Sequence, residues 1–403
     1  MNAPKITIFV VLIAAVVGSI TYLNSQKAVR GGGSEVVTVI PRPPAERPIE
    51  EVLNTTDEIL QEKNTAPDTV PVPAKKNTLA QDKSKKYELA KEITTPDGFI
   101  NTDGKPVTIG EFIGKKVVLI DFWTYSCINC QRTTPYLNAW YERYKDRGLV
   151  IFGIHTPEFE FEKIYQNVLE ATKRVGIKFP VVLDNDYSTW TAYKNRYWPR
   201  KYLIDIDGYI VYDHLGEGAY EETEKRIQEA LEERSKALGI AEDVKDETVF
   251  LEDARAPSRG NVGSPEIYFG AARNERLGNG IIGTRGVQNL TEPKNISPNT
   301  LYLDGQWDIT DEYVENRGPA KIIFRYKAQY VYIVASAENA VRAKILVDGQ
   351  VIETPGTDVD EDGFVTIQKD QLYTLVAGLT SEEHTLEIVM ENPGLRAFTF
   401  TFG

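Results

Sequence analysis

The pattern of apolar residues changes once along the chain, and this change constrains the fold more than any other feature. Between residues 117 and 238, apolar runs typical of buried strands alternate with segments of helical period, as in parallel strands joined by helices. Strands are expected at residues 117–123 and 149–155, and helices near 159–175, near 188–196 and at 220–238. After Ser264, short segments of alternating hydrophobicity follow one another with turn residues between them. The sequence therefore predicts an α/β domain followed by an all-β, jelly-roll-like sandwich.

Composition divides the chain further. A chain of 403 residues is longer than one hydrophobic core usually supports, so two folded domains are expected. Stretches rich in proline and in charge mark linkers on either side of the α/β domain. The predicted segments are a membrane anchor over residues 1–30, a disordered linker over 31–88, the α/β domain over 89–240, a second linker over 241–263 and the all-β domain over 264–403.

The chain holds two cysteines, Cys127 and Cys130, which follow the aromatic strand VVLIDFW. Two thiols so close together form only a tiny loop, so they cannot be a stabilising disulfide framework. At the start of a helix, the first thiol meets free backbone N–H groups and the positive end of the helix dipole, which stabilise a thiolate. Cys127 is therefore predicted to be the nucleophile, and Cys130 the thiol that resolves a mixed disulfide.

Two other classes of function fit the composition poorly. A structural zinc site needs four ligands, and the other soft ligands are the scattered histidines His155, His214 and His384. A net charge of −13 repels a phosphate backbone, which argues against a nucleic-acid partner.

The residues around the cysteines carry a resemblance to a known family. The segment VVLIDFWTYSCINC resembles the active-site strand and helix start of the thioredoxin superfamily, in its TlpA-like branch. The segments GIHTPEF, VVLDNDYSTWTAYKNRYWPRKYLIDIDG and GEG further resemble the soluble part of DipZ-type proteins. Those proteins join a CcdA-like, electron-carrying membrane domain to a thioredoxin-like domain and a carbohydrate-binding-module-like sandwich. The resemblance thus implies a thioredoxin-like fold for the α/β domain.

The resemblance also implies an acid beside the thiols. Asp121 lies six residues before Cys127, where the family has a buried carboxylate that can take the proton of Cys130 during resolution. The lysine that accompanies this acid on the neighbouring strand is not found in LVIFGIH, residues 149–155. We therefore expect a buried acid without its usual cation.

Three aromatic or proline residues are the predicted substrate-binding set. The resemblance places Trp198 and Pro199 at a cis-proline turn that faces the sulfurs, where the backbone can pair with an extended substrate chain. A trans-proline at the start of a strand is the alternative. Trp123 would shape the rim of the groove.

His155 and Glu158 in GIHTPEF could bind a metal ion, and copper chaperones of the Sco kind would be the nearest model. That family spaces its cysteines by three residues and not two, so plain packing is preferred for His155. We predict no cofactor besides the redox-active disulfide of Cys127 and Cys130, and no bound metal in the α/β domain.

The all-β domain offers two candidate binding features. Asp358, Asp360 and Asp362 fall at positions 1, 3 and 5 of a calcium loop, but position 12 is Lys369, so an acidic hairpin turn is the alternative. On the resemblance to carbohydrate-binding modules, a sugar-stacking face is expected, with packing in the core as the alternative. Its aromatic residues would be Tyr302, Trp307, Tyr330 and Tyr332.

An uncharged run near the N-terminus, residues 6–23, is long enough to cross a bilayer as one helix. A cleaved signal peptide is the alternative, although its best small-residue site, Val17-Gly18-Ser19, matches poorly. We expect a single-pass protein of the cell membrane with extracytoplasmic soluble domains, where redox domains tethered in this way are expected. Because the chain has one short hydrophobic segment where DipZ-type proteins have many spans, its electron donor is expected to be a separate CcdA-like protein.

These features predict a membrane-tethered thiol–disulfide oxidoreductase that reduces protein disulfides. Two other functions stay open. One is an envelope glycan-binding protein with a vestigial redox domain, against which the intact Cys-X-X-Cys pair argues. The other is a thiol peroxidase, which uses the same fold.

Overall fold

The computed structural model describes residues 83–241, 247–251, 262–378 and 381–403. The predicted membrane anchor and the first linker up to residue 82 lie outside these residues. Within the described ranges, no helix has the length and apolar character that crossing a bilayer requires.

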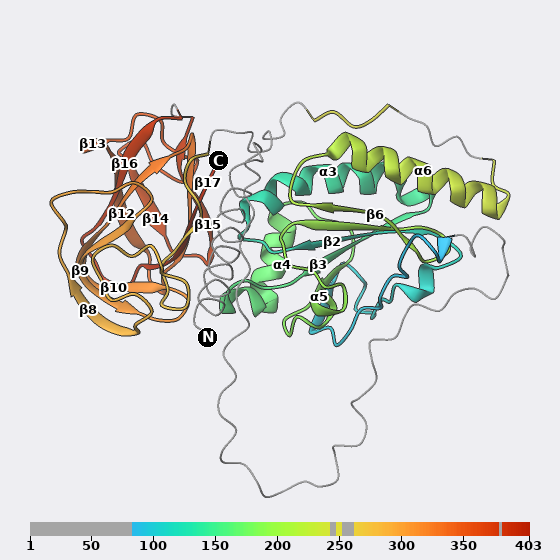
Figure 1. Cartoon of the computed structure of the whole chain (residues 1–403), viewed down its shortest axis with the longest axis horizontal. Helices are drawn as coiled ribbons and strands as arrows, with labels where there is room; N and C mark the ends of the chain where they lie inside the picture. Colours follow the sequence, from blue (N-terminus) through green and yellow to red (C-terminus); the bar gives the residue numbers. More distant parts are fainter. Residues whose placement is uncertain (1–82, 242–246, 252–261, 379–380) are drawn as a thin grey trace, which may run out of the picture.

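The first domain is a six-stranded sheet with helices on its faces (Figure 1). The strand order is β1-β4-β3-β2-β5-β6, with β2, β3 and β4 parallel and the outer strands antiparallel to their neighbours. The strands are β1 (Gly98–Ile100), β2 (Val117–Trp123), β3 (Leu149–His155), β4 (Val181–Leu183), β5 (Arg200–Ile204) and β6 (Ile210–Leu215). The helices are α3 (Ile128–Tyr144), α4 (Tyr165–Arg174), α5 (Ser188–Ala192) and α6 (Tyr220–Leu238). The predicted α/β domain is confirmed.

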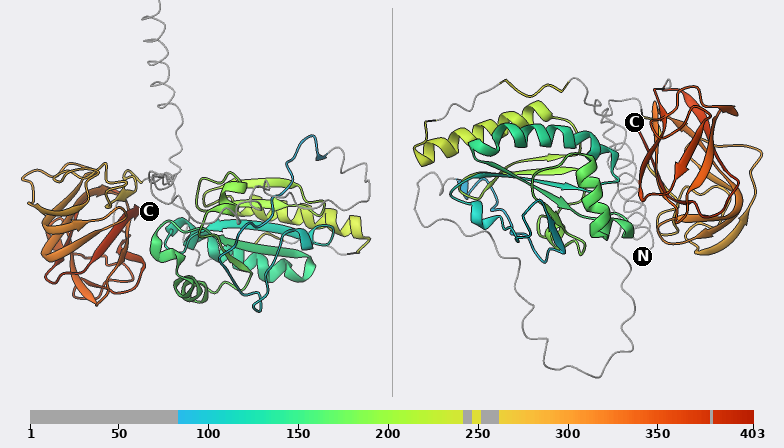
Figure 2. Two further views of the ribbon diagram at one scale, coloured as in Figure 1. Left: turned by 90° about the horizontal axis from the view of Figure 1, so that it is seen from below. Right: turned by 180° about the vertical axis from the view of Figure 1, so that it is seen from behind.

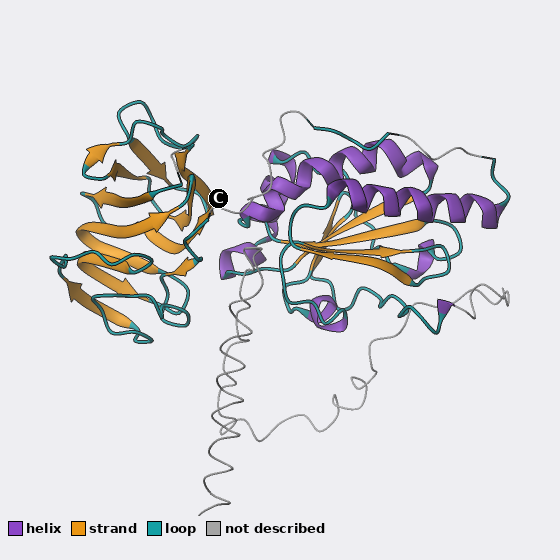
Figure 3. Ribbon diagram, turned by 45° about the horizontal axis from the view of Figure 1, so that its top comes forward, coloured by secondary structure: helices purple, strands orange, loops and turns teal. Residues whose placement is uncertain are grey.

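Local sequence explains most of these elements. Strands β2 and β3 are continuous apolar runs buried along their whole length, as central parallel strands require. Helices α3 and α6 lie side by side on one face of the sheet (Figure 3), where Glu224 accepts hydrogen bonds from Trp140 Nε1 at 3.1 Å and Tyr144 Oη at 2.7 Å. Gly239 ends α6 in a left-handed conformation, which glycine adopts without steric cost.

Two helices differ from the expectation. The helix expected near residues 159–175 is a 3-10 turn at Glu160–Lys163 followed by α4 from Tyr165, because Ile164 between them is extended. The helix expected near 188–196 ends at Ala192.

The second domain is all-β, as predicted, and its eleven strands form one hydrogen-bonded network. The long strand β10 connects this network, since it pairs with β9, β16 and β17. The strands are β7 (Ile267–Tyr268), β8 (Gly286–Leu290), β9 (Leu301–Ile309), β10 (Val314–Lys327), β11 (Tyr330–Ser336), β12 (Val341–Val347), β13 (Gln350–Val351), β14 (Phe364–Ile367), β15 (Gln371–Ala377), β16 (Glu383–Met390) and β17 (Arg396–Phe402).

The two domains pack against each other, with β15 and β17 on the side that faces the α/β domain (Figures 1 and 2). Phe398 of β17 contacts the rings of Phe159 and Phe161, with centroids 5.1 and 4.8 Å away. Beside it, Arg273 Nη1 donates to Glu158 Oε1 at 2.8 Å. Residues of both domains thus belong to one hydrophobic cluster, which the sequence did not predict.

The aromatic residues of the expected sugar-stacking face are mostly in the interior. Trp307, Tyr332 and Tyr302 are buried, and Tyr330 is half-buried. Trp307 packs within the core of the all-β domain, while Trp307 Nε1 donates to the backbone oxygen of Asp304 at 2.9 Å. These rings therefore do not offer an exposed face on which a sugar could stack.

Candidate functional site

The two cysteines lie at the junction of β2 and α3. Cys127 is the N-cap residue of α3, and its Sγ accepts a hydrogen bond from the backbone N–H of Cys130 at 3.4 Å. Cys127 is half-buried and Cys130 is buried, and both are free thiols. Burial, together with the neighbouring Cys127, raises the pKa of the Cys130 thiol well above its ordinary value. Cys127 is thus the more exposed of the two thiols, and the raised pKa of Cys130 favours its protonated form.

Asp121 is buried in the middle of β2, also as predicted. Burial raises the pKa of Asp121 to about 7, and the nearby ammonium of Lys201 partly offsets this effect. The negative charge of the Asp121 carboxylate also raises the pKa of Cys130. A carboxyl group that titrates near neutral pH beside a buried thiol is suited to accept that thiol's proton.

The expectation that this acid lacks a lysine is wrong. Lys201 of β5 lies directly opposite Asp121 in the antiparallel register, and its Nζ is 3.8 Å from Asp121 Oδ1. The lysine is fully buried, and burial lowers its pKa. The lysine was expected on β3, on one side of β2, whereas the cation comes from β5 on the other side.

Trp123 and His155 fill the interior at the ends of β2 and β3. The two rings meet edge to face with centroids 5.1 Å apart, and Trp123 also covers Gly153, where a β-carbon would lie 2.9 Å from its indole nitrogen. Trp123 is only 4% exposed, so it packs beneath the site and does not form the rim. His155 is fully buried against Trp123 and Tyr125, which agrees with the packing interpretation.

The proline turn has the predicted form. The peptide bond between Trp198 and Pro199 is cis, and the backbone oxygen of Pro199 accepts from Gly216 N at 2.8 Å. Trp198 is buried against Trp190, with ring centroids 4.4 Å apart. The tryptophan side chain therefore supports the turn from inside.

A second buried acid, which sequence reasoning missed, holds the loop before Cys127. Glu162 Oε1 accepts from Ser126 Oγ at 2.6 Å and from Ser126 N at 3.3 Å. Its other oxygen accepts from the backbone N–H groups of Glu158 and Phe159, at 2.6 and 3.0 Å. Burial raises the pKa of Glu162 to about 7. Nothing in the acidic segment EFEFE marks this glutamate as buried.

A largely buried ion pair links α3 to the segment that follows β6. Arg132 Nη1 lies 2.8 Å from Glu217 Oε1, and both side chains are largely excluded from solvent. Glu217 belongs to the GEG segment, residues 216–218, whose Gly216 carbonyl accepts from Lys201 Nζ at 3.4 Å. The GEG segment therefore connects the helix that carries the cysteines to the lysine beside Asp121.

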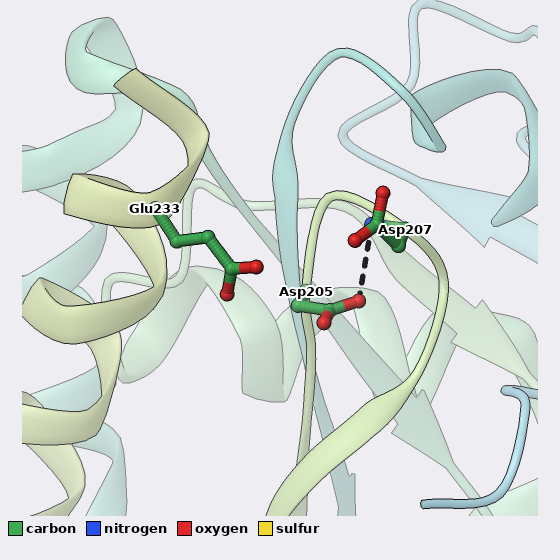
Figure 4. A group of neighbouring side chains, drawn as sticks. All are labelled: Asp205, Asp207 and Glu233. Carbon is green, nitrogen blue, oxygen red and sulfur yellow. Dashed lines mark hydrogen bonds between the residues drawn. The ribbon is translucent and has the colours of Figure 1, made fainter. Parts of the chain in front are cut away.

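One group of carboxylates in the described residues has a spacing that could hold a metal ion (Figure 4). Asp205, Asp207 and Glu233 surround the ammonium of Lys83, which lies 2.5 Å from Asp205 Oδ2 and 2.9 Å from Asp207 Oδ2 and also pairs with Glu233. The lysine supplies the positive charge that these acids require. The cluster anchors the chain segment before β1.

The candidate calcium loop has protein partners for its acids. Asp358 Oδ2 accepts from Thr374 N at 2.7 Å, and Asp360 pairs with Arg342 at 3.0 Å. The backbone oxygen of Asp362 accepts from Lys344 Nζ. The structure therefore uses this segment as an acidic turn, which was the alternative interpretation.

Comparisons with known proteins cover both domains. The sequence model of the Redoxin family matches residues 61–231, and that of the thioredoxin-like C-terminal domain matches residues 264–403. The chain is 36% identical over 317 residues to protein DipZ of Mycobacterium tuberculosis (strain CDC 1551 / Oshkosh), covering 77% of this chain and 43% of that protein. It is 29% identical over 142 residues to the thiol-disulfide oxidoreductase YkuV of Bacillus subtilis (strain 168), covering 36% of this chain and 93% of that protein.

Solved structures also resemble the first domain. A putative thiol:disulfide interchange protein DsbE from Chlorobium tepidum is 24% identical and aligns with a TM-score of 0.32, covering 36% of this chain and 96% of that one. The chain spans less than half the length of the DipZ proteins that it matches.

Proposed function

Because the chain belongs to the thioredoxin superfamily, in its DipZ-type branch, we propose that it is a thiol–disulfide oxidoreductase that reduces protein disulfides. The observation that carries the proposal is the arrangement of an accessible Cys127 above a buried Cys130, with Asp121 and Lys201 beside them. Cys127, Cys130 and Asp121 each take part in a two-step exchange, and Lys201 partly offsets the rise in the pKa of Asp121 that burial causes.

In the first step, the Cys127 thiolate attacks one sulfur of a substrate disulfide. A bond forms between Cys127 Sγ and that sulfur, and the substrate's other sulfur leaves as a thiolate. The backbone N–H of Cys130, at the start of α3, donates to Cys127 Sγ and so points at the reacting sulfur. The product is a mixed disulfide.

In the second step, Cys130 resolves the mixed disulfide. Its proton passes to Asp121, whose pKa of about 7 leaves part of the population able to accept it at neutral pH. Cys130 then attacks Cys127 Sγ, the Cys127–Cys130 disulfide forms, and the second substrate thiolate leaves. Two electrons have moved from the protein to the substrate, and a dithiol donor must return them.

We propose that this donor is a separate CcdA-like membrane protein and that residues 1–30 anchor the chain with its domains outside the cytoplasm. The support is the similarity to DipZ proteins, which extend well beyond the matched part, and the uncharged run at residues 6–23. Protease added to intact cells should cleave the chain. Complete protection, with other surface proteins cleaved, would contradict this orientation.

The jelly-roll-like fold of the all-β domain and its binding of cell-envelope glycan also stay proposals. They rest on the resemblance to carbohydrate-binding modules. The burial of Trp307 and Tyr302 requires that any such glycan bind elsewhere on the domain. Titrating the full chain with peptidoglycan fragments tests the proposal, and absence of saturable binding would leave the domain a purely structural part.

A thiol peroxidase is the second candidate, because Thr124 lies three residues before Cys127, the spacing found at peroxidatic cysteines. The two activities need different cysteines. A peroxidase requires Cys127 for its reaction with hydrogen peroxide, whereas the proposed reductase requires both thiols for each turnover.

The Cys127→Ser and Cys130→Ser variants of the full chain test the proposal. Cys127→Ser should lower reduction of a protein disulfide at least about 1,000-fold, because it removes the nucleophile. Cys130→Ser should accumulate a mixed disulfide through Cys127. Rapid peroxide consumption by Cys130→Ser without any substrate adduct would favour the peroxidase instead.

A further inference from the structure

The lysine beside Asp121 is fixed by the GEG segment. Lys201 Nζ contacts Asp121 Oδ1 at 3.8 Å and the carbonyl of Gly216 at 3.4 Å. Burial lowers the pKa of this lysine, and the charge of Glu217, one residue further on, partly offsets that effect by favouring the protonated form. The position of the GEG segment therefore determines how closely the ammonium approaches Asp121.

The GEG segment is itself held by Arg132. The guanidinium binds Glu217 Oε1 at 2.8 Å and Asn129 Oδ1 at 3.3 Å, so it ties the segment to α3. The side chains of Arg132 and Glu217 are only 4% and 12% exposed. An ion pair is screened little when water is kept away, so this pair holds its partners more firmly than a surface pair would.

Residues of the all-β domain contact Arg132. The Tyr332 ring of β11 covers the guanidinium, with its centroid 5.7 Å from Arg132 Cζ. A β-carbon at Gly403 would lie 2.5 Å from Arg132 Nη2, so the backbone there passes directly against the arginine. Tyr332 and Val334 also belong to the hydrophobic cluster of the α/β domain.

We propose that the all-β domain positions the proton acceptor of the redox site, through Tyr332, Arg132 and Glu217. The inference rests on the proposed function and assigns a role to the second domain in the same reaction. Arg132 and Tyr332 are positioning residues, since they act on Asp121 through Glu217 and Lys201.

Breaking this chain of contacts has a predictable electrostatic result. Without Arg132, Glu217 loses the guanidinium that binds its Oε1 at 2.8 Å, and its charge draws the Lys201 ammonium away from Asp121. Besides Lys201, the titratable groups around this site include Cys130 and Arg132 from α3, Tyr220 from α6 and Tyr332 from β11. His214 from β6 also lies there, with its Nε2 3.3 Å from the backbone oxygen of Glu217. Lys201 is the group that lowers the pKa of Asp121, so its withdrawal keeps Asp121 protonated to higher pH.

The experiment measures the rate of protein-disulfide reduction by the full chain as a function of pH. The acidic limb of the profile is the pH range in which the rate rises as Asp121 loses its proton. Arg132→Met should shift this limb to higher pH by about one pH unit. Tyr332→Leu should shift it in the same direction by less, because the arginine remains but is open to water. Tyr332→Phe, which keeps the ring over the guanidinium and removes only the hydroxyl, should shift the limb less than Tyr332→Leu. Arg285→Met, which breaks an exposed ion pair with Asp311, should retain the wild-type limb.

The outcomes separate this inference from the proposed function. Wild-type protein without Cys127-dependent reduction would contradict the proposed function itself. Active wild-type protein, with the same acidic limb in Arg132→Met and Tyr332→Leu, would overturn the role of the all-β domain alone. If Arg132→Met does not fold, the comparison of Tyr332→Leu with Tyr332→Phe still decides the question.

Discussion

The two domains treat buried polar groups differently. Among the described residues of the α/β domain, the buried side chains that can carry a charge are Asp121, Arg132, His155, Glu162, Asp184, Lys201, Asp205 and Glu224. In the all-β domain the buried polar residues are uncharged, namely Ser264, Asn274, Asn316, Ser336, Thr374, Thr399 and Thr401. Burying a charge is unfavourable unless it is paired. The α/β domain accepts this penalty at several places, among them Asp121 and Lys201 beside Cys130, whereas the all-β domain is stabilised by apolar packing.

The largest expected effect on stability therefore belongs to the core of the all-β domain. Trp307 is fully buried there, and Trp307→Ala should lower the free energy of unfolding of this domain by about 3–5 kcal/mol. Thermal unfolding of the full chain, monitored by circular dichroism, measures the effect. At temperatures where both domains remain folded, alkylation of Cys127 should proceed at the wild-type rate, because Trp307 belongs to a separate hydrophobic cluster. A slower alkylation under those conditions would show that the two cores are not independent.

In contrast to Trp307→Ala, a change at Asp121 should mainly lower the rate of the redox reaction. Asp121→Asn removes the acceptor for the proton of Cys130, and resolution of the mixed disulfide should slow about 100-fold near pH 7. The loss should shrink at alkaline pH, where hydroxide can take the proton. Rapid-quench measurement of the mixed disulfide gives the rate.

Asp184 provides a matched control for Asp121. It is a buried aspartate of the same domain, but it accepts from the backbone N–H groups of Thr189 and Trp190 at the start of α5. Asp184→Asn should leave the rate of resolution and its pH dependence unchanged. If both variants slow resolution equally, burial of a carboxylate in this domain matters and the position of Asp121 does not.

The smallest expected effect is a pH dependence of stability from Glu162. Its folded-state pKa of about 7 lies above the ordinary value of 4.5, so between these values the folded chain holds a proton that the unfolded chain has lost. Stability should therefore fall as pH rises from about 4.5 to 7, by at most about 3 kcal/mol from this group. Glu162→Gln should lack that part of the slope in urea unfolding at pH 5 and pH 8. An equal change in the free energy of unfolding between pH 5 and pH 8 in wild type and variant would contradict the raised pKa of Glu162.

Features that the local sequence marks could be predicted, and features that depend on long-range contacts could not. Strands β2 and β3 and helix α6 have the predicted limits, because continuous apolar runs and a terminal glycine mark them locally. The Cys-X-X-Cys pair and the buried acid at Asp121 were also evident. Lys201 was missed because its role depends on the long-range pairing of β5 with β2, and a single lysine beside an arginine resembles a surface residue.

The domain interface had no local signal either. Tyr332 and Phe398 lie on strands whose aromatic residues alternate like those of any sandwich core, and nothing in their spacing shows that they meet the other domain. The prediction of a sugar-stacking face failed for the same reason, since alternation alone does not distinguish a buried ring such as Trp307 from an exposed one.

The proposed reductase requires that Cys127 and Cys130 interconvert between a dithiol and a disulfide, and that the dithiol form is a reductant of protein disulfides. Equilibrating the full chain in glutathione buffers of increasing oxidation, then trapping thiols and measuring mass, tests it most directly. We expect complete conversion between the dithiol and an intramolecular disulfide, with a midpoint potential more negative than about −240 mV, so that protein disulfides are reduced. Absence of the Cys127–Cys130 disulfide at every ratio, or a midpoint near about −120 mV as in a strong oxidant, would contradict the account.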